Sequence, residues 1–405
     1  MPFASRPLTP QGQRFVAAAE ALIPAFQSRA FEADRSGVMN ESNYRDLQKN
    51  GIAAACVPEE LGGFGLTCMH DWALGIAALA RGDGSTAIAI NMHLGVSRGM
   101  ALAWRMAKAR GLPTDGAAVP LRAVAEGHML VCATATERGT DNLHLLTEAT
   151  DEGEHLRING TKLFVTMSPL ATHLGMNLRL RDAEGDHLAT TLLPIHTPGI
   201  EPQNDWDALG MRASGSQSVK FNNVKVARSS VRKLGPWGQW STGVLTNRAV
   251  GNLCLVATFL GMGERAFEIT VETLDKQQRT GGSAATLPGV QHMVGEMQIE
   301  LSTCRSVLTT ATRAADDFLA LEAPTLEQAH ALMQDYQVAK WVVNQGAIRL
   351  VNSAMDVVGG SSFMSNHPLS RLYRDVRAGP FMQPGSRPEA REYIGQVALR
   401  RYPEA

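Results

Sequence analysis

The spacing of hydrophobic residues changes twice along this chain, and these changes limit the folds open to it. Over residues 11–125 apolar side chains recur at helical spacing, as in Phe15, Ala19, Leu22 and Phe26. From about residue 129 they follow the alternation of strands, and from about 245 to 399 helical spacing returns. We predict an N-terminal helical domain at 1–126, a middle β-barrel or β-sandwich domain at 127–236 and a C-terminal four-helix bundle at 237–405.

Composition agrees with a globular protein that binds small molecules or copies of itself. The 405 residues are 44% hydrophobic, enough to fill two or three cores. Lys and Arg number 38 against 39 Asp and Glu, so no overall field favours nucleic acid or an anionic membrane. Five scattered cysteines indicate neither a disulfide framework nor a zinc site, and no histidine shows ligand spacing to acids.

Targeting segments are not evident in the sequence. The first seven residues lack the apolar run of a signal peptide. The apolar stretch at 250–262 is shorter than the roughly 20 residues that span a bilayer. We therefore expect a cytoplasmic protein that makes no membrane contact.

Three features are expected within the β-domain. Asn159 and Gly160 lie between two β-prone runs at 156–165, which predicts a tight hairpin. A second hairpin is expected to join 178–181 to 187–193, and Asn222-Asn223 predicts a bulge in the strand at 219–226.

Four motifs together resemble the acyl-CoA dehydrogenase superfamily, across about Gln11 to Leu399. They are the proline- and glycine-rich loop at 57–65, the threonine-rich segment at 133–141, the strand at 160–166 and the segment at 209–216. The resemblance implies a flavin between the β-domain and the C-terminal bundle, with FAD expected and FMN or free reduced flavin as alternatives. It also implies a homotetramer or homodimer.

The resemblance implies roles for residues of the β-domain. Thr136, with Thr134 beside it, would donate to the carbonyl edge of the isoalloxazine. Strand alternation places Phe164 and Thr166 on one face, where the ring would stack on the flavin and the hydroxyl would bond near its redox-active nitrogen. Thr140 is the candidate contact to substrate. The alternative is a threonine-rich strand face with an ordinary core aromatic.

Further residues match the family in the C-terminal bundle. Gln291 matches a glutamine that helps hold FAD from a neighbouring subunit, and Gly359 and Gly360 match glycines that pass near its pyrophosphate. Asp356 replaces a family glutamine there, and a carboxylate near phosphates is unfavourable, which favours the FMN or free-flavin alternative. Arg248 is a candidate contact to a CoA phosphate.

The expected catalytic base is missing. Gln383 stands where the family commonly holds the glutamate that removes the α-proton of an acyl thioester, and an amide cannot remove it. The family's other base position lies on the helix at about 245–261, where this chain offers Asn247, Gly251 and Asn252. The sequence contains no Asp or Glu from Ala208 through Gly263.

Three functions follow from these observations. The first is a flavin-dependent oxidoreductase acting on an acyl-CoA or related small substrate, with an electron-transfer flavoprotein as partner. The second is a two-component monooxygenase that uses oxygen and reduced flavin from a partner reductase, with His93 as a candidate proton donor beside the flavin. The third is a catalytically inactive flavin or acyl-CoA binding protein. A lone histidine on a helix is more often structural, which is the alternative for His93.

Overall fold

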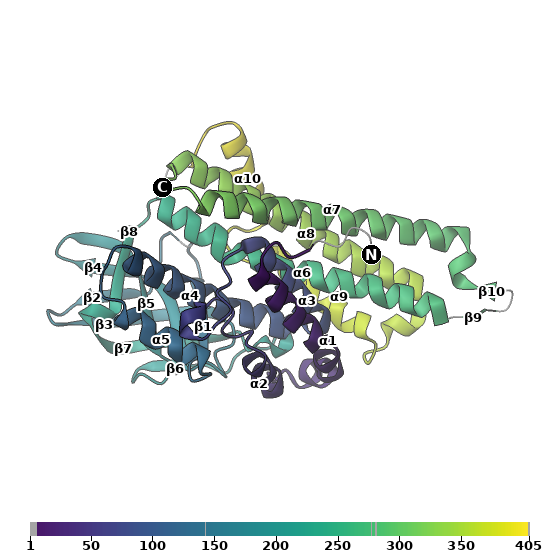
Figure 1. The fold of residues 1–405 in the computed structure, drawn as a ribbon, viewed down its shortest axis with the longest axis horizontal. Helices are drawn as coiled ribbons and strands as arrows, with labels where there is room; N and C mark the ends of the chain where they lie inside the picture. Colours follow the sequence, from purple (N-terminus) through teal and green to yellow (C-terminus); the bar gives the residue numbers. More distant parts are fainter. Residues whose placement is uncertain (1–5, 142, 277, 280–281, 404–405) are drawn as a thin grey trace.

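A computed structural model describes residues 6–141, 143–276, 278–279 and 282–403. Helices gather at the two chain ends and strands between them, so the predicted fold class is confirmed (Figure 1). The N-terminal helices are α1 (Pro10–Ser36), α2 (Glu41–Lys49), α3 (Met69–Gly82), α4 (Gly84–Ala109) and α5 (Asp115–Ala125). The later helices are α6 (Thr242–Lys276), α7 (Pro288–Leu319), α8 (Leu326–Val358), α9 (Pro368–Asp375) and α10 (Arg387–Ala398).

Close packing of α1 against α3 depends on two glycines. A Cβ on Gly12 would lie 2.0 Å from Asp71, and one on Gly75 would lie 2.1 Å from the Phe15 ring. Asp71 also accepts hydrogen bonds from the backbone N–H of Thr9, the residue that caps α1. The first helix is therefore anchored to α3, which in turn packs against α6.

The middle of the chain forms a mixed eight-stranded sheet. The strand order is β6-β7-β3-β2-β4-β5-β8, with β1 paired parallel to β4. The strands are β1 (Val131–Thr134), β2 (Glu148–Asp151), β3 (His155–Val165), β4 (His173–Asp182), β5 (Gly185–Pro194), β6 (Ile200–Pro202), β7 (Gln217–Ala227) and β8 (Val231–Pro236). The β4–β5 hairpin is confirmed, and so is the bulge, because the register between β3 and β7 shifts opposite Asn222 and Asn223.

The hairpin predicted at Asn159-Gly160 is wrong. Both residues lie inside the continuous strand β3, which pairs with β2 and β7. Gly160 has φ +146°, and a Cβ there would approach the Thr147 hydroxyl to 2.5 Å. The glycine therefore permits close packing within the sheet and does not form a turn.

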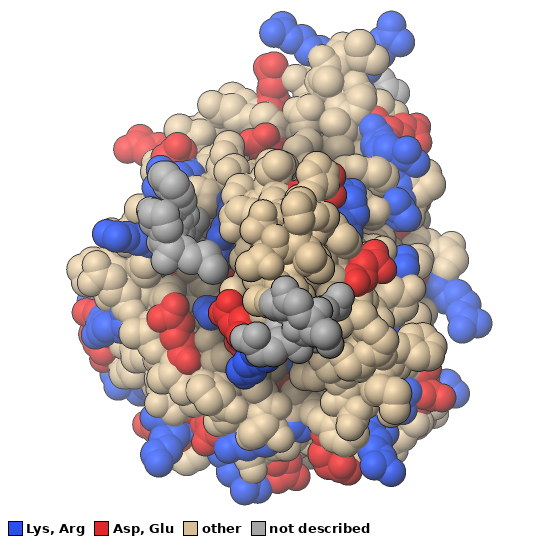
Figure 2. Space-filling model, turned by 90° about the vertical axis from the view of Figure 1, so that its right-hand side faces the viewer, with Lys and Arg blue, Asp and Glu red and all other residues tan. Residues whose placement is uncertain are grey.

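The C-terminal bundle is built from α6, α7 and α8, with α10 packed on α8. Thr325 and Gln328 form a capping box that starts α8. Since α7 and α8 run antiparallel, the start of α7 and the end of α8 lie at the same end of the bundle, far from the sheet (Figure 1). Figure 2 faces this end and shows a broad central area without Lys, Arg, Asp or Glu.

Helix α6 is the one described helix long and apolar enough to cross a membrane by length and composition. Its most apolar window is 67% buried inside the protein, where α6 packs against α3 and α8. A core helix of a folded protein meets the same criteria, so this helix alone is weak evidence for a membrane span.

Candidate active site

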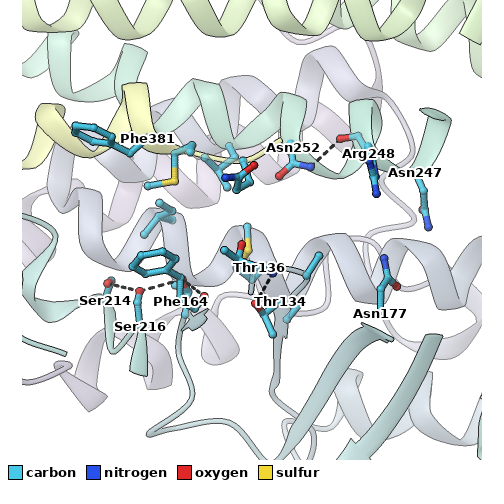
Figure 3. Close-up of a pocket in the computed structure, with 18 of the residues that line it drawn as sticks. Thr134, Thr136, Phe164, Asn177, Ser214, Ser216, Asn247, Arg248, Asn252 and Phe381 are labelled. Atoms are coloured by element: carbon cyan, nitrogen blue, oxygen red, sulfur yellow. Dashed lines mark hydrogen bonds between the residues drawn. The ribbon is translucent and has the colours of Figure 1, made fainter. Parts of the chain in front are cut away.

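A cavity of about 970 Å³ lies between the sheet, α4, α6 and the segment that follows α9. Three stretches of the β-domain form one wall: the end of β1, the end of β3 and the turn before β7. Helix α6 and residues 374–383 face them across the space (Figure 3). Three of the four family motifs, at 133–141, 160–166 and 209–216, thus converge on one site, whereas the loop at 57–65 does not line it.

The end of β1 is tied to β3. The Thr134 hydroxyl donates to the Leu163 carbonyl over 2.8 Å and accepts from the Thr136 N–H over 3.2 Å. The Thr136 carbonyl in turn accepts from the Leu163 N–H over 2.9 Å. Both threonines line the cavity, but because the Thr134 hydroxyl is already engaged, Thr134 mainly positions Thr136.

Phe164 and Thr166 face the cavity and Val165 is fully buried, as the alternation predicts. Phe164 is 56% exposed, and its ring makes an edge-to-face contact with the Trp206 ring at a centroid distance of 6.1 Å. Its backbone is left-handed, with φ +52°, and it lies in the register shift between Lys162 and Val165 in the pairing of β3 with β7. An aromatic face is therefore held open towards the cavity.

Two serines extend the hydroxyl surface beside Phe164. The Thr166 hydroxyl lies 2.9 Å from that of Ser216, which lies 2.7 Å from that of Ser214. All three line the cavity, and each is less than a tenth exposed. Both serines belong to the motif at 209–216, but no role was predicted for either.

The opposite wall carries amides and an arginine. Asn247, Arg248 and Asn252 project from α6, and the Asn252 amide donates to the Arg248 carbonyl over 2.7 Å (Figure 3). The Arg248 guanidinium lies 5.1 Å from the centre of the Trp240 ring. Burial lowers the Arg248 pKa to about 10, so the side chain stays charged at neutral pH. Arg232 and Lys233 of β8 also line the cavity.

Gln383 lines the cavity too, at the position expected for the catalytic glutamate. Its side-chain oxygen accepts from the Gly385 N–H over 3.0 Å. Asp207 is the only carboxylate among the described lining residues, and its side chain is 88% exposed and paired with Arg212 at 2.9 Å. The described lining therefore offers no buried base.

Three domain models of one protein family match successive parts of the chain. The acyl-CoA dehydrogenase N-terminal, middle and C-terminal domain models match residues 11–107, 131–224 and 244–399. The chain belongs to the acyl-CoA dehydrogenase family. The resemblance inferred from the motifs is thus confirmed.

Relatives of this acyl-CoA dehydrogenase family member include proteins that are not named as acyl-CoA dehydrogenases. The amino sugar nitrososynthase DnmZ of Streptomyces peucetius is 34% identical, over 98% of this chain and 95% of its own. The structure of KijD3 in complex with FMN and dTDP-3-amino-2,3,6-trideoxy-4-keto-3-methyl-D-glucose has a TM-score of 0.90 at 30% identity, covering 98% of this chain and 96% of that one. Butyryl-CoA dehydrogenase from Megasphaera elsdenii shares the fold, with a TM-score of 0.83. Its sequence is 21% identical, and the match covers 98% of this chain and 100% of that one.

These comparisons support a flavin-dependent oxidoreductase of the acyl-CoA dehydrogenase family. They do not support acyl-CoA as the substrate in particular, because DnmZ is named for an amino sugar and KijD3 was solved with one. The site also fits a flavin, since a planar ring system can stack on the exposed Phe164 face while Thr136 and Thr166 supply hydrogen bonds at its edge.

His93 does not face the cavity of this family member. Its imidazole is fully buried, with Nε2 2.9 Å from the Ala53 carbonyl and Nδ1 accepting from the Val131 N–H over 3.0 Å. Burial lowers the His93 pKa to about 4. Both ring nitrogens thus hold α4 against its neighbours, which corrects the proton-donor role considered from the sequence.

The remaining predicted residues lie outside the cavity. The Thr140 hydroxyl donates to the His144 carbonyl over 2.5 Å, so it shapes its own loop. Gln291 stands near the start of α7, and Gly359 and Gly360 follow the end of α8, so all three gather at the far end of the bundle. Their predicted role requires a neighbouring subunit, and it stays a prediction.

One group of potential metal ligands went unnoticed in the sequence. Asp182, Glu184 and His187 bring ligand atoms within 4.8 Å of one another on the β4–β5 hairpin. Lys233 lies 2.9 Å from Asp182 and also pairs with Glu184. The ammonium group thus already offsets part of the charge of these two carboxylates.

Proposed function

We propose that this protein is a flavin-dependent monooxygenase that oxidises the amine of a nucleotide-linked amino sugar. The whole-length relationship to DnmZ and the likeness to KijD3 with its bound amino sugar support this substrate class. A bound flavin would supply oxygen-activating chemistry at the Phe164 face. FMN or free reduced flavin fits this reaction better than a tightly held FAD, given Asp356 on the adenosine side of the family's site.

The observation that carries the proposal is the absence of a suitable base. Acyl-CoA desaturation requires a carboxylate beside the substrate's α-carbon. Gln383 and the α6 residues Asn247 and Asn252 occupy the relevant wall as amides, and the described lining adds only the exposed, paired Asp207. Oxidation at an amine needs no such carboxylate.

The charges around the cavity suit an amine in its reactive form. Five basic residues line the cavity against one acid in the described lining: Arg232, Lys233, Arg248, Arg374 and Arg377. Acids outside the lining pair with two of them, Asp182 and Glu184 with Lys233 and Asp34 with Arg374, so these two contribute less. Nearby cations and removal from water both lower the pKa of a bound amine. The lining therefore favours the neutral amine, whose lone pair is the group to be oxidised.

One end of the cavity suits the nucleotide part of such a substrate. Arg248 lies there with Asn177 and Asn247 beside it (Figure 3). Arginine and amide donors together match the oxygens of a diphosphate. Asp34, at 2.9 Å from Arg374, partly neutralises the charge on the residue 374–383 side, so that side suits a diphosphate less well.

The experiment supplies purified protein with FMN, NADH, a flavin reductase and oxygen, and offers a dTDP-linked 3-amino sugar. We expect hydroxylamine and nitroso products by mass spectrometry, and much slower turnover of the free amino sugar that lacks the nucleotide.

The matched control mixes flavin-loaded protein with acyl-CoA thioesters of several chain lengths under anaerobic conditions. Bleaching of the flavin by a thioester would contradict the proposal and restore dehydrogenation. Flavin binding with no turnover of either substrate class would favour the inactive binding protein.

A further inference from the structure

Thr166, Ser216 and Ser214 form a continuous row of hydroxyl groups along the cavity wall (Figure 3). Thr166 and both serines line the cavity together with the exposed Phe164. Besides the 2.9 Å contact with Ser216, the Thr166 hydroxyl has the Phe164 carbonyl at 3.4 Å. That distance exceeds the usual 2.5–3.0 Å for such a bond, so Ser216 is the stronger partner.

The backbone that carries the serines is fixed at several points. Met211 and Gly215 both adopt left-handed conformations, with φ +53° and +57°. The Met211 N–H donates to the Asp375 carboxylate over 2.6 Å, and the Ser214 carbonyl accepts from the Met167 N–H over 3.0 Å. The freedom left in this row therefore lies in the rotation of the hydroxyl hydrogens.

Such a row can point in two directions. Each hydroxyl offers one donor and two acceptor lone pairs. When Ser214 donates to Ser216 and Ser216 donates to Thr166, the Thr166 hydrogen is free to donate into the cavity. In the other direction, Thr166 donates to Ser216 and Ser216 donates to Ser214. A lone pair of Thr166 then faces the cavity and can accept a hydrogen bond. The Ser214 hydrogen points into the cavity, which Ser214 also lines.

We propose that this reversible hydroxyl row lets the flavin site hold both redox states of the cofactor. Reduction places a hydrogen on a flavin ring nitrogen, which changes that atom from an acceptor to a donor. Thr166 would donate to the oxidised ring and accept from the reduced one, with Ser216 as a positioning residue that takes or supplies the hydrogen. This inference rests on the proposed function, because a two-component monooxygenase must bind reduced flavin and later release the oxidised form.

The test measures binding and needs no turnover. Dissociation constants of the flavin-free protein for oxidised FMN and for dithionite-reduced FMN are determined anaerobically in wild type and Ser216→Ala. Without Ser216, Thr166 has only the distant Phe164 carbonyl to receive its hydrogen when it accepts. We expect the affinity for reduced FMN to fall about fivefold more than that for oxidised FMN, as for one lost hydrogen bond.

Two matched variants separate this role from a structural one. Ser216→Thr keeps the hydroxyl and should keep the wild-type ratio of the two dissociation constants. Ser168→Ala removes a buried hydroxyl that donates to the neighbouring Gly215 carbonyl over 3.3 Å and does not line the cavity, so it should leave the ratio unchanged. If Ser216→Ala weakens the binding of oxidised and reduced FMN equally, the inference is overturned but the proposed function is not. The same holds if Ser216→Thr behaves like Ser216→Ala. Wild-type protein that binds neither form of FMN would overturn the proposed function as well.

Discussion

Phe164 presents its ring to the cavity through an unusual backbone. Its left-handed φ of +52° is one that side chains with a Cβ rarely adopt. Strain of this kind, of order 1–3 kcal/mol, persists where the surrounding structure imposes it. Here the register shift at the end of β3 imposes it and turns the ring out of the core.

Two substitutions at Phe164 separate the ring from the backbone. Phe164→Ala and Phe164→Gly should both weaken flavin binding by about 1–3 kcal/mol, the usual effect of losing a stacking aromatic. The glycine variant should nevertheless be more stable to denaturant than the alanine variant by about 1 kcal/mol, because glycine adopts this conformation freely. Flavin titration and urea unfolding measure the two effects. Equal stability of the two variants would show that the backbone is unstrained.

Strand alternation predicted Phe164 and Thr166 on one face, and both line the cavity. The structure reaches this arrangement through the register shift and the left-handed backbone at Phe164, which alternation does not reveal. The contact between Thr166 and Ser216 was not predictable, since it depends on a loop turned by two left-handed residues far along the chain. His93 was misassigned because its backbone partners, the Ala53 carbonyl and the Val131 N–H, come from segments whose positions the sequence does not reveal.

At the scale of elements, a buried ion pair joins the loop after β1 to β3. Glu137 is 3% and Lys162 is 0% exposed in their side chains, with 2.5 Å between the charged atoms. Glu137 also accepts from the backbone N–H groups of Leu146 and Thr147. The pair therefore fixes the segment that carries Thr136 to the cavity wall.

Removing one member of this pair should be strongly destabilising. Lys162→Met leaves the Glu137 charge buried without its partner, which should lower the free energy of unfolding by about 3–5 kcal/mol. Adding Glu137→Gln removes that charge while its amide oxygen remains for one of the two backbone donors, and should restore about 1 kcal/mol or more. Denaturant unfolding of both variants provides the measurement. A double variant less stable than Lys162→Met would argue against this account.

Asp375 links α9 to the cavity loop in a pH-dependent way. Burial raises the pKa of this carboxyl from 3.8 to about 6, although Arg371 and the Met211 N–H oppose the rise. Between these values the folded protein holds the proton more tightly than the unfolded chain does, so this group's contribution to stability is lost as pH rises. From pH 4 to 6, the unfolding free energy of wild type minus that of Asp375→Asn should fall by about 2 kcal/mol. A difference that stays flat or rises would contradict the raised pKa.

At the scale of the whole molecule, the order of helical and strand periods was sufficient to predict the architecture. The long helices α7 and α8 lie within the stretch from about 245 to 399 whose helical spacing predicted the bundle. Sheet details were less predictable because Gly160 serves close packing between strands, a use that looks like a turn signal in the sequence alone.

The far end of the bundle has the features of a contact between copies of this chain. Gln291, Gly359 and Gly360 lie there, about as far from their own cavity as the bundle allows (Figure 1). Phe363 and Met364, which follow the two glycines, are 83% and 60% exposed, and Figure 2 shows the uncharged area at this end. Large exposed apolar side chains gathered on one surface commonly mark an interface.

We therefore expect a homo-oligomer in which a second copy covers this end. Replacing both Phe363 and Met364 by glutamate should dissociate the oligomer, because charges would be buried at the interface. The control Leu146→Glu, at an exposed position in the β-domain, should leave the oligomer intact. Light scattering after size-exclusion chromatography measures the mass. If the second copy also contacts the adenosine half of FAD, dissociation should weaken FAD binding and leave FMN binding nearly unchanged. Wild-type protein that is monomeric at micromolar concentration would contradict the expectation and would leave Gln291, Gly359 and Gly360 without a cofactor to bind.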